Sequence, residues 1–362
     1  MEAETFSDIS IKISTFYLKF ATLWAVTLNA SLLLILIKVY VMTVNKVKLN
    51  ELIQFMKDHF WKHNYNYREK EILADSSMVC SVIAIAITIG GHAVVTMQCF
   101  APIIANMGKN ETDRILPFNM LCDFILISPY YEIFYFVQQC IITPSCVFFC
   151  FDEIICLMSL HVSAQFRILQ YRLVNLYDTI EKMQDDNANV NVTMYSCKCY
   201  EKLKNCIRQH QDLINFSAKI EEVFTLIIFA ETTMVSGLIC LLGYQMLSGT
   251  VELLSRLSCG AGAFGSSVLL LMVMYSCNDL IVQSDNVSLS AYSAPWTLMP
   301  MDKFGRSLRN DLMMVSVRSR RVCCLTANGF FPISLETYSK IMSTAVSYFT
   351  LLTSRTESMI ED

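Results

Sequence analysis

Five long runs without a charged side chain constrain this chain of 362 residues more than any other feature. Each run approaches or exceeds the roughly 20 apolar residues that a helix needs to cross the hydrocarbon core of a bilayer. Helices of a soluble core would alternate with a polar face, and these runs do not. Charged residues make up 17% of the chain, below the roughly 25% of soluble domains, so composition also favours a membrane protein. The runs cover residues 20–37, 76–108, 133–151, 232–251 and 257–278.

The last apolar segment, residues 329–354, differs from these five runs. Glu336 and Lys340 interrupt it, and only residues 341–354 are free of charge. Polar groups at membrane depth are tolerated where they face protein or water, and there they tend to mark function. We therefore count six spans, and we predict an all-α, polytopic membrane protein whose last span is an inner helix that lines water.

The basic residues predict the orientation of the spans. Segments 45–75, 167–219 and 303–321 together hold 20 of the 28 Lys and Arg residues. Because basic loops stay in the cytoplasm, these three segments should face inward and both termini outward. Asn110 begins an Asn-Glu-Thr sequon in the outer loop after the second span, which makes it a candidate glycosylation site.

The inward-facing segments are themselves patterned as helices. Apolar residues recur at helical spacing in 48–60, 165–177, 200–220 and 303–321. The spans should therefore continue as long helices into a cytoplasmic bundle. Such a bundle either assembles subunits or packs only within its own chain, and the pattern leaves both readings open.

Catalytic and metal-binding patterns are close to absent. His59 and His63 stand four residues apart, but two ligands do not close a zinc site, and a solvated helix face explains them as well. The chain has no phosphate loop, dinucleotide fingerprint or nucleophile elbow. Topology accounts for the basic segments, so nucleic acid is not implied. We expect no enzyme activity, no cofactor and no metal.

Several short blocks of sequence keep a fixed order and spacing along the chain. In that order they resemble the insect odorant receptor family, over about residues 15 to 354. The family has seven spans, and the first run of this chain resembles its second. The blocks are SPYYEI at 128–133, Asp152, His161 and Gln165, SLSAYSAPW at 288–296, LTANG at 325–329, SLETY at 334–338, and SYFTLL at 347–352.

The resemblance implies a function. Such receptors are odorant-gated, non-selective cation channels that need no G protein, and the odour-tuned subunit forms a heterotetramer with a shared co-receptor. The implied location is the plasma membrane of sensory neuron dendrites, in contact with membrane lipid and with the C-terminus extracellular. The implied divisions are a ligand-binding membrane domain over 1–285, a cytoplasmic anchor and assembly helix in 286–328, a pore-lining helix over 329–354, and a short extracellular tail over 355–362.

Each subunit of the family gives its last helix to a central pore, and this suggests pore residues here. On a helix that begins at Ile341, one broad face carries the predicted pore and gate residues. Leu351 or Leu352 would form an apolar ring that gates by dewetting, unless these leucines only pack against other helices. The residues of this face are Thr344, Tyr348, Leu351, Leu352 and Arg355.

The ligand of the family is a volatile small molecule, bound in the outer half of the membrane. Such a site should be apolar and aromatic with few polar anchors. His92, inside the second span, could serve as an anchor or could fill a helix-packing position. Candidate ligand-binding residues, chosen by depth, are Trp24, Leu28, His92, Val95, Tyr135 and Gln139.

Two other classes remain open. A gustatory receptor shares the architecture, but Thr344-Ala345 stands where the tail of that family resembles Gln-Phe. A membrane enzyme would need convergent His, Asp or Glu residues, and transporters usually show internal repeats; the sequence shows neither.

Overall fold

A computed structural model describes residues 33–61, 64–108, 110, 114, 116, 127–142, 145–176, 192–247 and 253–361. These residues form helices and connecting turns, with a single isolated bridge between Thr326 and Pro332, so the all-α prediction is confirmed. A short apolar helix, Leu33–Val44, comes first. It is followed by α2 (Lys46–Phe55), the π-helical η1 (Met56–Trp61), α3 (Tyr67–Ala105), α4 (Tyr130–Ile142), α5 (Ser145–Val174), α7 (Val192–Leu247), α8 (Leu253–Ser293), the 3-10 helix η4 (Trp296–Leu298), α9 (Lys303–Ser319) and α10 (Leu335–Glu361).

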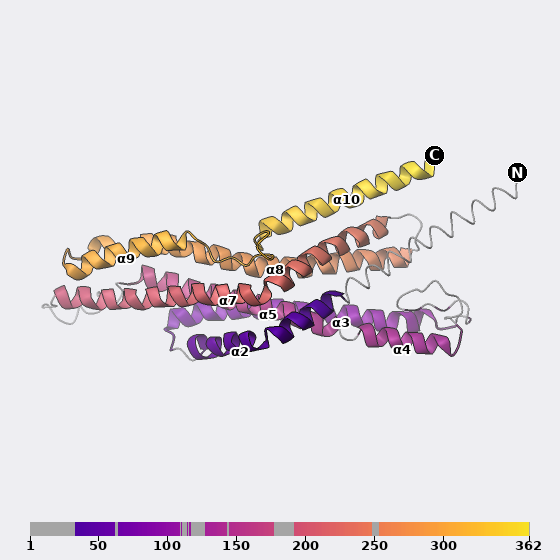
Figure 1. The fold of residues 1–362 in the computed structure, drawn as a ribbon, viewed down its shortest axis with the longest axis horizontal. Coiled ribbons are helices and arrows are strands. Elements are labelled where there is room, and N and C mark those ends of the chain that lie inside the picture. Colours follow the sequence, from indigo (N-terminus) through magenta and orange to yellow (C-terminus); the bar gives the residue numbers. More distant parts are fainter. Residues whose placement is uncertain are drawn as a thin grey trace.

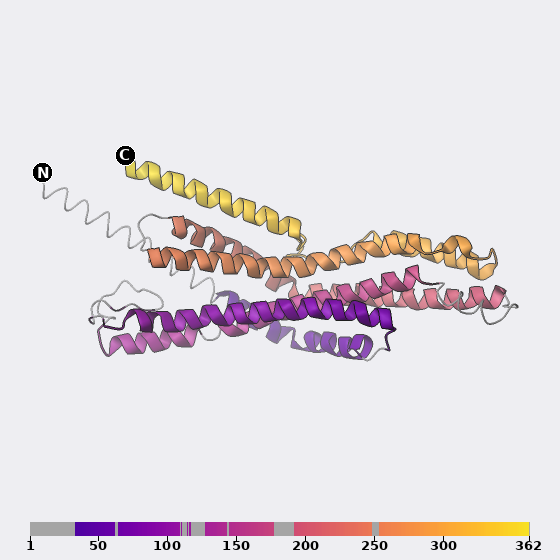
Figure 2. The same cartoon turned by 180° about the vertical axis from the view of Figure 1, so that it is seen from behind.

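The helices form one elongated bundle in which α3, α5, α7 and α8 run along the long axis (Figure 1). At one end α9 lies over the start of α7, and at the other end α4 lies along α3. The yellow helix α10 leaves the bundle near its middle and extends toward the end that holds α4, as the reverse view also shows (Figure 2). Of the long helices that the structure describes, only α10 projects from the bundle in this way.

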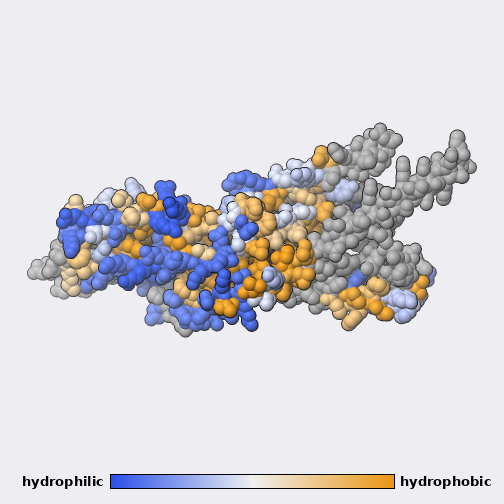
Figure 3. All heavy atoms as spheres, viewed as in Figure 1, coloured by the Kyte–Doolittle hydropathy of each residue, from blue (hydrophilic) through white to orange (hydrophobic). Residues whose placement is uncertain are grey.

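Hydropathy divides the bundle into two halves along this axis. On the face in Figure 3, hydrophilic residues prevail over α9 and the first part of α7, and hydrophobic residues gather in the middle of the bundle and on α4, while the coloured part of α10 is pale or blue. We call these the polar half and the apolar half. Within the described residues, four helices contain stretches long and apolar enough to cross a membrane: Tyr67–Ala93, Phe149–Val174, Met194–Tyr244 and Gly260–Leu298. The same helices continue into the polar half, as the striped segments predicted.

The described residues of the third predicted run fall in two of the helices. The run over 133–151 falls partly in α4, which ends at Ile142, and partly in α5, which begins at Ser145. Within the described residues, the stretch Phe149–Val174 of α5 is long and apolar enough to span.

The core of the bundle lies around α5. The apolar window of α5 is 61% buried, against 22% for that of α3, because α5 packs against α3, α7 and α8. Where α3 crosses α5 the two come very close, since a Cβ on Gly91 would lie 2.4 Å from the ring of Phe149. Further along α5, Ile168, Leu169 and Leu173 are fully buried, so the predicted stripe of the 165–177 segment is the packing face.

Candidate pore helix and ligand-binding residues

The helix α10 packs against the bundle by one face only. Tyr338, Ile341 and Met342 contact the hydrophobic core, and Ala345 is buried. One turn later, the ring of Phe349 lies on Gly243 of α7, where an added Cβ would be 3.1 Å from the nearest ring atom. These positions recur every three or four residues, the spacing of one helix face. The stripe holds α10 against α7 and α8.

The opposite face of α10 is exposed and rich in hydroxyl groups. The hydroxyls of Ser347, Thr350 and Ser354 each donate to a carbonyl oxygen of the preceding turn, over 2.9 to 3.0 Å. A hydroxyl that bonds back to its own helix needs no partner side chain, and its oxygen can still accept from water. Tyr348 and Leu351 flank this row and are 57% and 55% exposed.

The predicted pore residues fall on this exposed side as far as the structure describes them. Thr344, Tyr348 and Leu351 all point away from the packed stripe. Leu352 and Arg355 continue the same helix, but their side chains lie outside the described part of the structure. That these five residues line a pore stays a prediction.

The LTANG block forms the turn that leads into α10. Leu325 and Ala327 are fully buried, and the amide of Ala327 donates to the carbonyl of Phe331 at 2.9 Å. Asn328 and Gly329 adopt φ angles of +52° and +80°, a conformation that favours Asn and Gly. A tight, buried turn of this kind fixes where α10 starts.

Side chains of α7 hold this turn in place. Thr225 donates to the carbonyl of Thr326 at 2.9 Å and accepts from the amide of Asn328 at 2.8 Å. Glu221 accepts from the hydroxyl of Thr326 at 2.5 Å. Sequence reasoning missed both α7 residues, because no local pattern links them to a turn a hundred residues later. Burial raises the pKa of the Cys323 thiol beside the turn, which keeps it uncharged.

The structure places some of the predicted ligand-binding residues and leaves out others. Trp24 and Leu28 lie outside the described residues, and so does the side chain of Val95 on α3. Tyr135 of α4 donates its hydroxyl to the carbonyl of Cys99 at 2.5 Å, which fastens α4 to α3.

The remaining two candidates differ in their surroundings. Gln139, one turn beyond Tyr135, is half-buried. His92 is exposed, and its Nδ1 lies 2.7 Å from the carbonyl of Thr88 on its own helix. The structure thus brings Tyr135 against the outer part of α3 and turns His92 outward. Their role in ligand binding stays a prediction, and Asn110, exposed beyond the end of α3, stays a candidate glycosylation site.

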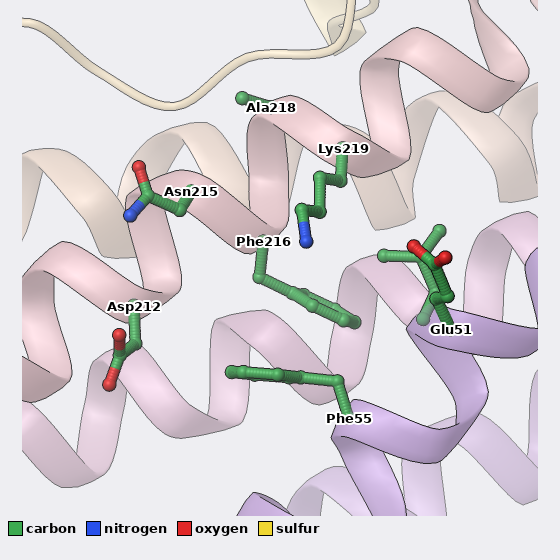
Figure 4. Close-up of a pocket in the computed structure, with 8 residues that line it drawn as sticks. Glu51, Phe55, Asp212, Asn215, Phe216, Ala218 and Lys219 are labelled. Carbon is green, nitrogen blue, oxygen red and sulfur yellow. The ribbon is translucent and has the colours of Figure 1, made fainter. Parts of the chain in front are cut away.

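Two cavities in the described part of the structure lie away from the predicted ligand-binding residues. A cavity of about 450 Å³ opens between α2 and α7 (Figure 4). Its floor is the stacked pair of Phe55 and Phe216, with ring centroids 5.2 Å apart, and Glu51, Asp212 and Lys219 stand around it. A second cavity of about 330 Å³ is lined mainly by polar groups of α3, α5 and α7. Neither includes a predicted ligand-binding residue.

One buried cluster was missed by sequence reasoning. Lys38 of the first described helix lies 2.5 Å from Asp152 of α5 and 3.3 Å from Glu231 of α7. Each of these residues borders a charge-free run: Lys38 ends the first, Asp152 ends the third, and Glu231 precedes the fourth. The predicted topology puts all three borders at the inner side of the membrane, so the sequence did contain a signal for their meeting.

The comparison with known families decides what kind of protein this is. The family model described as 7tm Odorant receptor matches residues 23–346. The chain belongs to the odorant receptor family. It is therefore a multi-pass membrane receptor, and its family is not an enzyme family. The resemblance predicted from the sequence blocks is confirmed.

Individual odorant receptors agree with this assignment. The chain is 23% identical to Odorant receptor 13a of Drosophila melanogaster over 332 residues, which cover 86% of this chain and 74% of that one. It is 24% identical to Odorant receptor 10 of Aedes albopictus over 62% of this chain and 56% of the relative. The olfactory receptor OR5 from Machilis hrabei, solved in complex with eugenol, shares the fold at a TM-score of 0.76 and 14% identity, over 92% of this chain and 81% of that chain.

Proposed function

We propose that this odorant receptor is the odour-tuned subunit of an odorant-gated, non-selective cation channel, which it forms with a shared co-receptor subunit. The observation that carries the proposal is the one-sided packing of α10. One face of this helix is buried against α7 and α8, and the other is left exposed with a row of hydroxyl groups.

Lipid would be a poor solvent for that exposed face. In a single-chain bundle, a lipid-facing helix would gain from apolar side chains, as the outward residues of α3 illustrate with Ile85 and Ile89. On α10 the central exposed positions are Ser347, Thr350 and Ser354 instead. In a heterotetramer, four such helices around one axis would put these hydroxyls along a water-filled path. Leu351, next to them, would supply the apolar constriction that opens and closes by wetting.

The rest of the chain takes its place around this pore. Residues 1–285 would bind a volatile odorant between the spans, with Trp24, Leu28, His92, Val95, Tyr135 and Gln139 as candidate contacts. Residues 286–328, which include α9, would anchor the subunits to one another in the cytoplasm. The short tail after residue 354 would be extracellular, and the channel would act in the plasma membrane of sensory dendrites.

An electrical recording tests the proposal. We expect odour-evoked currents when the chain is co-expressed with the co-receptor in oocytes and exposed to a panel of volatile compounds. We also expect Leu351→Thr to raise the current in the absence of odour, because a hydroxyl in the constriction favours wetting. Val346→Thr is the comparison variant, since Val346 is exposed on α10 and flanks the hydroxyl row on the side opposite Leu351. Surface-expressed receptor that gives no odour-evoked current would contradict the proposal.

A further inference from the structure

The cluster of Lys38, Asp152 and Glu231 joins three helices by charged side chains in the interior of the bundle. The side chains of Lys38 and Asp152 are 0% exposed and that of Glu231 is 3% exposed. One turn away on each helix stand buried apolar residues, among them Leu34, Ile155 and Ile227. We call the three charged residues the ion triad. Nothing in the proposed channel mechanism uses it.

The formal charges of the ion triad do not cancel. One ammonium group faces two carboxylates, so the triad would carry one net negative charge if all three groups were ionised. Burying an uncompensated charge among apolar side chains is costly, and a buried group usually changes its protonation state instead. In the part of the chain that the structure describes, the other titratable side chains that act on these carboxylates are the thiols of Cys156 on α5 and Cys277 on α8, which bring no positive charge.

The hydrogen bonds of the triad also indicate that one carboxyl group is protonated. Lys38 donates to Oδ1 of Asp152. The remaining carboxylate oxygens, Oδ2 of Asp152 and both oxygens of Glu231, accept no hydrogen bond from any group in the described part of the chain. The two carboxyl groups lie close together, because both approach the same ammonium nitrogen. A proton on one of them would supply the missing donor and would remove the excess charge at once.

We propose that the ion triad is a proton-binding site: it holds one ammonium, one carboxylate and one protonated carboxyl group, with the proton shared between Asp152 and Glu231. The triad is then neutral overall. It ties the helix Leu33–Val44 to α5 and α7 without leaving a net charge inside the membrane domain. Removal of either carboxyl group should release the proton, because the carboxyl group that remains can ionise and pair with Lys38.

Infrared spectroscopy of the purified receptor, assembled with its co-receptor, tests for the proton directly. We expect the wild type to show the carbonyl stretch of a protonated carboxyl group that is lost in Glu231→Gln and equally lost in Asp152→Asn. Gln and Asn keep the size of the native side chains, so both variants should fold. A wild type without this band, or a band that survives either substitution, overturns the proposal. If the wild type lacks the band and its stability depends on sodium, a metal cation and not a proton balances the charge, which also overturns the proposal.

Surface expression of the full chain with its co-receptor gives a second test. Each single substitution should leave surface expression within about twofold of wild type, because one carboxylate still pairs with the ammonium. The double variant D152N/E231Q removes both carboxylates that face the buried Lys38 and should lose expression several-fold. Adding Lys38→Met to the double variant removes the unpaired charge and should restore much of the loss. A double variant that reaches the surface as well as wild type would contradict the charge count.

Discussion

In the polar half of the bundle, side chains of neighbouring helices bond to one another, whereas in the apolar half large hydrophobic side chains face outward. Arg172 of α5, in the polar half, bonds to Glu69 of α3 at 2.6 Å and to Gln209 of α7 at 2.8 Å. In the apolar half, Phe100 of α3 and Phe136 of α4 are 57% and 69% exposed. In the polar half, hydrogen bonds within one chain therefore fix how the helices pack. The apolar half leaves much of its surface to contact lipid, partner subunits or ligand.

This difference suggests that the two halves are stabilised in different ways. A region whose polar groups are satisfied internally and whose core is closely packed holds a fixed arrangement. A region that exposes apolar surface gains its final stability from what surrounds it. The turn of the LTANG block sits where the two regions meet, and it carries α10 from the polar half out toward the membrane. Substitutions in the two halves should accordingly fail in different ways.

The largest effect should come from emptying the core of the polar half. Phe166 of α5 is fully buried, and Phe166→Ala should destabilise the receptor by about 3–5 kcal/mol. That is enough to remove most of it from the cell surface. Phe136→Ala removes the same atoms from an exposed position in the apolar half and should leave thermal stability in detergent nearly unchanged. Melting curves of the solubilised receptor compare the two, and equal losses would erase the contrast between the halves.

A smaller loss should follow from breaking the ion pair of the polar half. Glu69 is 4% exposed and pairs with Arg172, so Arg172→Met removes the guanidinium charge from beside a buried carboxylate and should cost about 3 kcal/mol. Adding Glu69→Gln should recover part of this loss, since no charge is then left unpaired. The control is Arg68→Met, which breaks the exposed pair with Glu71 and should cost less than about 1 kcal/mol. Thermal unfolding of the three variants and the wild type decides whether burial sets the cost.

The smallest effect on stability should come from the contact that holds α10. Gly243→Val pushes against the ring of Phe349 and should cost about 1–3 kcal/mol while displacing α10, so odour-evoked current should fall more than surface expression. Gly237→Val is the matched control on α7, since a Cβ there meets no atom within 4 Å. If both variants keep wild-type currents, the packed stripe of α10 does not set the position of the pore helix.

Much of the fold could be predicted from the sequence because hydropathy and helical period are local signals. The charge-free runs placed the apolar parts of α3, α7 and α8, and the stripe of Ile168, Leu169 and Leu173 predicted a buried face that the structure shows. The described residues of the run over 133–151 likewise fall in helices, in α4 and in α5.

The candidate site was harder to predict, since it depends on which way each helix faces. Leu351 and Tyr348 could be assigned to one side of α10 from helical spacing alone. For His92 the spacing gave no such answer, and in the structure its side chain is turned outward. The ion triad lay within reach of sequence reasoning, because its three members border charge-free runs at the same predicted depth. What the sequence could not provide was the distance between them, which depends on how three separate helices pack.

Cysteine accessibility along α10 tests the central claim most directly. In receptors co-expressed with the co-receptor, we expect a charged thiol reagent to block odour-evoked current through Ser347→Cys and Thr350→Cys, because these positions lie on the exposed hydroxyl face. The same reagent should not block Met342→Cys, which lies on the packed face, beyond the effect on wild type with its own cysteines. Block of Met342→Cys with no effect at positions 347 and 350 would contradict the claim that this face of α10 lines the ion path.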